Sequence, residues 1–383
     1  MANSKLYLGD INIGVFKFGN SDISLYLGNE KVYPTESHDY SQDYLTFVAL
    51  ENDSTYSYGG SGISYSIDDG TTWTELSESA YTPSINSGDK IMWKGNNLSK
   101  KSFIAPKTFN IRGNIMSLVS GDSFTAATTI KSYQFKSLFT NLGVVSARNL
   151  VLPATTLASN CYADMFNGCT SLTSAPKLPA TTLGIGCYAN MFNGCRSLTT
   201  APELLATTLK SSCYSNMFHG CSSLITAPEL PATTLANNCY QDMFYGCTNL
   251  TTAPELPATT LGISCYADMF NGCTNLTTAP ELPAKTLESN CYANMFYGCT
   301  NLTTAPELLA TTLVSGCYNY MFFGCSNLNY IKCLANNNSS TSNTQYWVSG
   351  VSSTGTFVKK SGASWSRGIS SIPEDWNVTN VYS

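Results

Sequence analysis

Fourteen of the fifteen cysteines recur at intervals of 26 residues, in two columns. Cysteines can bind metal or form disulfides, but a zinc site needs further converging ligands, and the chain has only His38 and His219. Stacked neighbours could come within disulfide distance, although their side chains would point into an apolar interior. We expect buried free thiols that fill space. The two columns are Cys161, Cys169, Cys187, Cys195, Cys213, Cys221, Cys239, Cys247, Cys265, Cys273, Cys291, Cys299, Cys317 and Cys325.

A column of carboxylates follows the same interval, with Lys177 at its head. Charges about 5 Å apart repel by roughly 1 kcal/mol per neighbour in water, so a bound cation is one interpretation. A solvated face is the interpretation that we favour. The carboxylates are Glu203, Glu229, Glu255, Glu281 and Glu307.

A third column varies in residue type and is partly aromatic. An exposed column of this kind would suit the binding of a sugar or a protein. The alternative is a rim that packs on the next copy. The candidate binding residues are Asn167, Asn193, His219, Tyr245, Asn271, Tyr297 and Phe323.

The sequence contains no recognisable catalytic motif. It has two histidines, no nucleophile elbow and no glycine-rich phosphate loop. The sequence does not exclude the pair of catalytic carboxylates that a glycosidase uses, although no motif points to such a pair. We therefore expect no enzyme activity, no cofactor and no metal.

The repeated segment must position these columns. Residues 160–169 carry apolar side chains at i, i+1, i+4, i+5 and i+8, which predicts about two turns of helix ended by Gly168. Residues 172–179 contain two prolines and predict a short strand, parallel to its equivalents at about 4.8 Å. A single copy cannot offset the entropy of ordering its backbone, so seven copies must stack as a solenoid. The predicted inward residues are Leu157, Cys161, Met165, Phe166, Cys169, Leu172 and Leu178.

Two predicted β elements precede the repeats. Residues 1–36 hold three short strands, each followed by Gly-Asp or Gly-Asn turns, and so small a sheet suggests docking or oligomerisation. Residues 43–107 alternate in polarity, with a hairpin around Asp68-Asp69-Gly70, and predict a β-sandwich.

The predicted fold is therefore mainly β with short helices. Residues 108–151 form the N-terminal cap of the solenoid, because Leu138, Phe139 and Leu142 stand where Met165, Phe166 and Cys169 stand. The solenoid occupies residues 152–333, and residues 334–383 form its C-terminal cap.

Composition narrows the possible partners. Charged residues are 12% of the chain, about half the usual share. The net charge of −5 and the lack of long basic clusters argue against nucleic acid and anionic membranes. No apolar run reaches the roughly 20 residues of a membrane span. The first residues lack an apolar secretion core, so we expect a mature form or a product made in a cytoplasm.

The Met-Phe pair, the Gly-Cys pair and the following Leu resemble the leucine-rich repeats of BspA-like proteins over about residues 133–333. That resemblance implies stacked turns used for adhesion or binding. The N-terminal Tyr-Leu-Gly repeats, residues 66–73 and the tail with Thr354-Gly355-Thr356-Phe357 resemble modules of fibre proteins from phages of gut Bacteroides-type bacteria.

We expect a structural attachment protein located in a virion, as a phage fibre or decoration protein. Residues 1–36 would bind other virion proteins or form a homo-oligomer, a trimer being favoured. The repeats would contact a glycan or protein of the host surface. The alternatives are a bacterial cell-surface adhesin of the BspA-like kind and a glycan-cleaving tail protein.

Overall fold

The chain forms two compact units, Met1–Tyr40 and Ser41–Ser383. The computed structural model describes residues 6–8, 11–13, 17–18, 23–27, 30–33, 38–78, 80–96, 98, 101–338 and 341–382. Within these residues the regular structure is mainly β, which confirms the predicted class. The helices described are short, namely α1 (Ser117–Ser120) and the 3-10 turns η1 (Tyr40–Gln42), η2 (Gly121–Ala126) and η3 (Thr341–Asn343).

The N-terminal unit contains five short strands in its described residues, where the sequence had suggested three. The two additional strands are β2 and β5, which follow the Gly-Asp pair at residues 9–10 and the Gly-Asn pair at residues 28–29. The turn residues themselves lie outside the described residues. An antiparallel pair joins β1 (Leu6–Leu8) to β2 (Ile11–Ile13), and a separate sheet holds β3 (Lys17–Phe18), β4 (Ile23–Leu27) and β5 (Glu30–Tyr33) in that order.

A six-stranded mixed sheet begins the larger unit. Its strand order is β13-β12-β6-β10-β8-β9. A small separate sheet pairs β7 (Ser57–Tyr58) with β11 (Phe103–Ile104). The strands of the large sheet are β6 (Leu45–Ala49), β8 (Ile63–Ser66), β9 (Thr74–Glu75), β10 (Lys90–Gly95), β12 (Phe109–Asn114) and β13 (Val144–Val151).

The predicted hairpin around residues 68–70 is confirmed, since β8 and β9 pair antiparallel. Aromatic rings fill the core beneath the sheet. The ring of Phe47 lies 5.4 Å from that of Trp93 and 6.0 Å from that of Phe139, measured between centroids. Because Phe139 belongs to the predicted cap, the sheet and the repeats share one core.

The sheet also continues past residue 107, the predicted end of the sandwich. β12 pairs antiparallel with β6 and parallel with β13, so it has a partner on both edges. Ser146 of β13 then forms a parallel bridge to Ser174 of the first copy. Backbone pairing therefore runs from the sheet through residues 108–151 into the repeats.

The predicted helix at residues 160–169 is wrong. Every fourth residue there has a positive φ, 54° at Asn160, 57° at Asp164 and 74° at Gly168. A left-handed residue at that interval interrupts a right-handed helix, and Asn, Asp and Gly tolerate it best. The segment instead forms successive tight turns, in which the Met165 N–H donates to the Tyr162 carbonyl at 3.3 Å.

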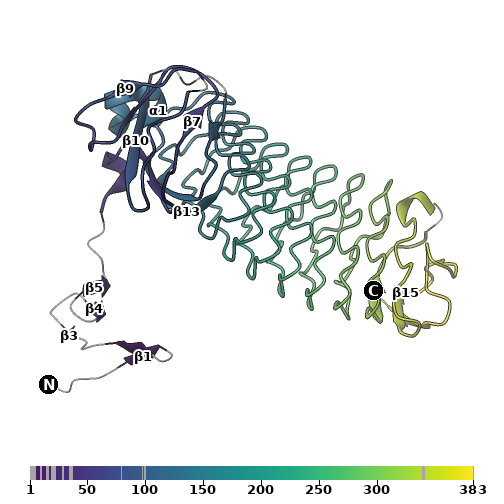
Figure 1. Cartoon of the computed structure of the whole chain (residues 1–383). Helices are drawn as coiled ribbons and strands as arrows, with labels where there is room; N and C mark the ends of the chain where they lie inside the picture. Colours follow the sequence, from purple (N-terminus) through teal and green to yellow (C-terminus); the bar gives the residue numbers. More distant parts are fainter. Residues whose placement is uncertain are drawn as a thin grey trace. The chain divides into compact units, whose positions relative to one another are not determined.

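Alternate residues of these turns hydrogen-bond to the next copy. The Tyr162 N–H donates to the Cys187 carbonyl at 3.0 Å, and the Phe166 N–H donates to the Met191 carbonyl at 2.9 Å. The same pattern recurs along residues 152–333, which we call the repeat stack. Figure 1 shows its copies following one another from teal to yellow-green.

The strand predicted at residues 172–179 is reduced to single parallel bridges. Thr200 bridges Thr226, which in turn bridges Thr252. Each of these threonines is followed by Ala-Pro, and proline has no N–H with which to extend a ladder. The backbone pairing between copies is therefore concentrated in the turns.

The left-handed positions give a direct stability test. Asn216 has a φ of 56°. Replacing it with Ala should lower the free energy of unfolding by about 1–2 kcal/mol, because Ala lacks the short polar side chain that lets Asn tolerate the left-handed conformation. Replacing it with Gly should change that free energy far less. Chemical denaturation of both variants measures the difference. Equal losses in the free energy of unfolding would contradict the requirement for a left-handed backbone at this position.

Both ends of the repeat stack are covered. At the N-terminal end, the Phe139 ring stacks on Phe166 with centroids 5.4 Å apart, as the cap alignment predicted. At the C-terminal end, Trp347 stacks on Tyr318 at 6.1 Å. A three-stranded parallel sheet completes this end, with β14 (Tyr330–Cys333), β15 (Thr356–Lys360) and β16 (Asn377–Val381) in that order.

Candidate functional site

The seven inward residues predicted for the first copy are all buried. A column of tyrosines, missing from that set, is buried with them from Tyr162 to Tyr318. Its ring centroids are between 5.8 and 6.1 Å apart. The hydroxyls of Tyr162, Tyr188 and Tyr292 are buried and have no hydrogen-bond partner in the part of the chain that the structure describes. The repetition of Tyr directly after Cys was the signal that could have identified this column.

The two cysteine columns lie in the same interior. All fifteen cysteines are free and buried. In the second column each thiol donates to a phenylalanine carbonyl, as Cys195 Sγ does to Phe166 at 3.2 Å. Burial raises the pKa of Cys169 and Cys221 to about 12. No three His, Cys, Asp or Glu side chains converge as metal ligands among the described residues.

These thiols should be unreactive in the folded protein. Both burial and a raised pKa suppress the thiolate, which is the reactive form. Titration with Ellman's reagent at neutral pH should detect almost none of the fifteen cysteines before denaturation and all of them afterwards. A folded sample in which several thiols react rapidly would contradict the buried columns.

The variable column is stabilised by contacts within the repeat stack. The rings of His219 and Tyr245 stack with centroids 4.5 Å apart, and those of Tyr297 and Phe323 stack at 4.7 Å. Burial lowers the pKa of His219. These contacts resemble a rim that packs on the next copy, and binding by this column stays a prediction. Its asparagines donate to their own copies, Asn167 to Asp164, Asn193 to Asn190 and Asn271 to Asp268.

A second surface has more room for a ligand. Three successive hollows lie between consecutive Ala-Pro-Glu-Leu segments, with volumes of about 390, 550 and 210 Å³. We call them together the Pro-Glu groove, and its segments are residues 227–231, 253–257, 279–283 and 306–309.

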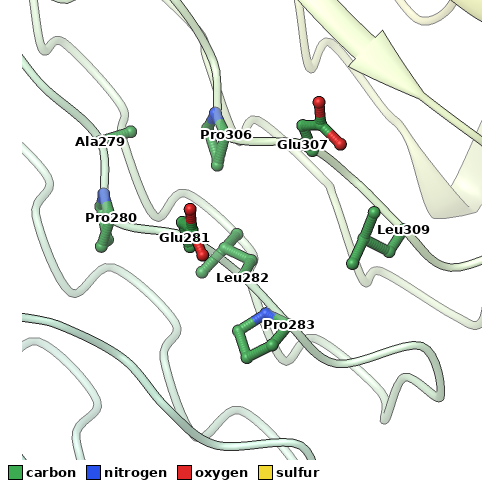
Figure 2. Close-up of a pocket in the computed structure, with 8 residues that line it drawn as sticks. All are labelled: Ala279, Pro280, Glu281, Leu282, Pro283, Pro306, Glu307 and Leu309. Atoms are coloured by element: carbon green, nitrogen blue, oxygen red, sulfur yellow. The ribbon is translucent and has the colours of Figure 1, made fainter.

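The walls of the Pro-Glu groove are prolines, alanines and leucines, and its charges are glutamates. Figure 2 shows Glu281 and Glu307 projecting from neighbouring segments, with Pro280, Pro283 and Pro306 around them. The glutamates are exposed. A rigid backbone carries them, because threonine bridges precede each segment and proline fixes its φ.

The chain itself shows what one of these carboxylates binds. At the C-terminal end of the groove, Lys332 Nζ donates to Glu307 Oε1 at 2.8 Å. This hydrogen bond raises the pKa of Lys332. An ammonium group therefore fits the last carboxylate of the column.

The comparison with known families bears on this repeated geometry. The family model for the BspA type leucine rich repeat region matches residues 159–292 and 237–350, with six copies. Together these residues make up half of the chain. The chain belongs to this family. Its BspA-type repeats are therefore the segments that carry both the cysteine columns and the Pro-Glu groove.

A search of curated proteins finds no match to this BspA-type chain. The described residues contain no helix of the length and hydrophobicity that a membrane span requires.

Proposed function

We propose that this BspA-type protein is a non-enzymatic attachment protein whose repeats form a solenoid and bind a surface partner through the Pro-Glu groove. The observation that supports this most is the row of three hollows, each placed between rigid proline segments. Such a row presents a proline and a glutamate at intervals of one copy. That regularity suits an extended partner, either a glycan chain or an extended protein segment.

The chemistry of the groove limits the partner. Carboxylates accept hydrogen bonds from sugar hydroxyls or from ammonium and guanidinium groups. Proline and leucine carbons can contact the apolar faces of a sugar ring or a peptide. The net charge of −5 disfavours a polyanion. We therefore propose a neutral glycan or a basic protein segment on a host surface.

The carrier that we propose is a phage virion, with a bacterial cell surface as the second candidate. The small antiparallel sheets of residues 6–33 favour the virion, because sheets of two and three short strands usually need a partner surface. Other virion proteins or further copies of the chain, in a trimer, would supply it. The BspA-type repeats favour the second candidate, an adhesin on a bacterial cell surface.

Binding of the labelled full-length chain to intact Bacteroides-type cells tests the proposed function. The variant Glu229→Gln/Glu255→Gln/Glu281→Gln should bind at least about ten-fold more weakly, equivalent to about 1.4 kcal/mol, because each carboxylate loses acceptor strength and charge. The matched control Glu78→Gln/Glu288→Gln/Glu374→Gln removes three exposed carboxylates outside the groove and should bind normally. Equal binding by both variants would contradict the role of the groove.

A further inference from the structure

A separate hollow of about 350 Å³ lies on the six-stranded sheet. Its volume falls within the range of about 300–1,000 Å³ that small-molecule sites occupy. Its lining is polar and comes from four elements, β8, β9, β10 and η2, together with the residues beside them. The lining residues are Gly62, Ser64, Glu75, Lys94, Gly95, Asn96, Gly121 and Asp122.

The strand register brings three of these side chains into one row. Lys94 of β10 lies opposite Ser64 of β8, which lies opposite Glu75 of β9. Residues directly opposite each other project from the same face of a sheet. An ammonium, a hydroxyl and a carboxylate are therefore neighbours on a rigid support. Among the described residues, the carboxylate of Glu75 has no hydrogen-bond or ion-pair partner.

Asp122 extends this row from η2. Its Oδ1 accepts hydrogen bonds from Lys94 Nζ at 2.8 Å and from the Tyr44 hydroxyl at 2.7 Å. Two hydrogen bonds lower the pKa of Asp122, and the one from Lys94 has a larger effect than the one from Tyr44. The carboxylate is therefore charged at neutral pH. Both described donors use Oδ1, which leaves Oδ2 to accept hydrogen bonds from a ligand.

An aromatic group borders the same row. The Lys94 ammonium lies 4.4 Å from the centroid of the Trp73 ring. The centroids of the Tyr44 and Trp73 rings are 4.8 Å apart. Trp73 Nε1 donates to the Gly70 carbonyl at 3.0 Å, which fixes the orientation of the indole. Trp73 is half-buried, so part of its surface is available for contact.

Glycines allow the elements that line the hollow to approach one another closely. A Cβ on Gly95 would lie 2.6 Å from the Gly62 carbonyl oxygen and 2.8 Å from that of Leu118. Gly121 has a φ of 49°, a left-handed conformation that favours glycine. The close backbone approach therefore requires residues without side chains at this point.

We propose that this hollow binds a neutral sugar ring. The carboxylates of Asp122 and Glu75 would accept hydrogen bonds from sugar hydroxyls, and the Lys94 ammonium and Asn96 amide would donate to them. Trp73 would contact the apolar C–H face of the ring. Two carboxylates against one ammonium disfavour an anionic ligand. The inference rests on the proposed attachment function for its biological role, but its residues are distinct from the Pro-Glu groove.

Saturation-transfer NMR on the full-length chain tests this site with glucose, galactose, mannose, fucose and N-acetylglucosamine as probes. At least one sugar should bind, and Glu75→Gln should weaken that binding about ten-fold. Glu75 is exposed and lacks a described partner, so this variant should fold normally. Asp122→Asn should weaken binding as well, whereas the control Glu78→Gln should not. No binding by any of the five sugars, or equal binding by Glu75→Gln and Glu78→Gln, would overturn the inference.

The two proposals fail in different ways. Loss of cell binding in the Pro-Glu groove variant, with no sugar bound by the sheet, would overturn the sugar site alone. Sugar binding that depends on Glu75, in a chain that binds no cells, would support the sugar site and contradict the proposed attachment function.

Discussion

Raising the pH from 8 to about 10.5 should unfold the repeat stack. Burial raises the pKa of its thiols above their ordinary value of 9.0, to about 12 at Cys169, Cys221 and Cys273. The folded protein therefore holds protons that the unfolded chain releases. The stabilisation is complete below the unfolded pKa and is lost as the pH rises above it. By pH 10 the ionisation of each thiol in the unfolded chain lowers the free energy of unfolding by about 1.4 kcal/mol. Over the fifteen cysteines this amounts to roughly 20 kcal/mol.

This loss exceeds the usual net stability of about 5–15 kcal/mol. The tyrosine column acts in the same direction, since burial raises the pKa of residues such as Tyr188 and Tyr266 well above 10.0. Circular dichroism and thiolate absorbance, recorded together in the presence of a reductant, should change in one steep step. Thiolate absorbance that develops near pH 9 while the dichroism stays native would contradict the account.

Phe244→Ala should destabilise the repeat stack by about 3–5 kcal/mol. Phe244 is fully buried. Its ring stacks between Phe218 and Phe270 with both centroid distances at 5.7 Å. Truncation removes both contacts and leaves a cavity in mid-stack. Because each copy contacts mainly its neighbours, the weakened interface should also separate denaturant unfolding into two transitions.

The same substitution at a less buried position separates the effect of burial from the effect of losing the phenylalanine ring. Phe323 is half-buried and stacks on Tyr297 at 4.7 Å, so Phe323→Ala should cost less than Phe244→Ala. Both variants lose the same atoms. Equal losses of the free energy of unfolding, with a single transition in each, would show that the phenylalanine column is not the element that couples the copies.

The residues of the interior were predictable, but the backbone that holds them was not. The interval of the cysteines places Cys161 and Phe166 inside any stack of copies. The same apolar pattern suggested a helix, because periodicity does not report that Asp164 adopts a positive φ. The continuation of the sheet through β12 was missed because strand pairing depends on contacts distant in sequence.

The candidate sites were less accessible to sequence reasoning. The repeated glutamates were recognised as an exposed column, but the hollows between copies depend on how neighbouring proline segments are spaced in three dimensions. The sugar site brings Asp122 to Lys94 across 28 positions of sequence. Neither residue belongs to a motif, so only the strand register and the fold reveal that they meet.

Hydrogen-exchange mass spectrometry tests the central claim most directly, with the full-length chain measured alone and with surface material released from the target cells. The account predicts slower exchange in the segments 227–231, 253–257 and 279–283 of the Pro-Glu groove. Slower exchange confined to the variable column between Asn167 and Phe323, or no change anywhere in the repeat stack, would contradict it.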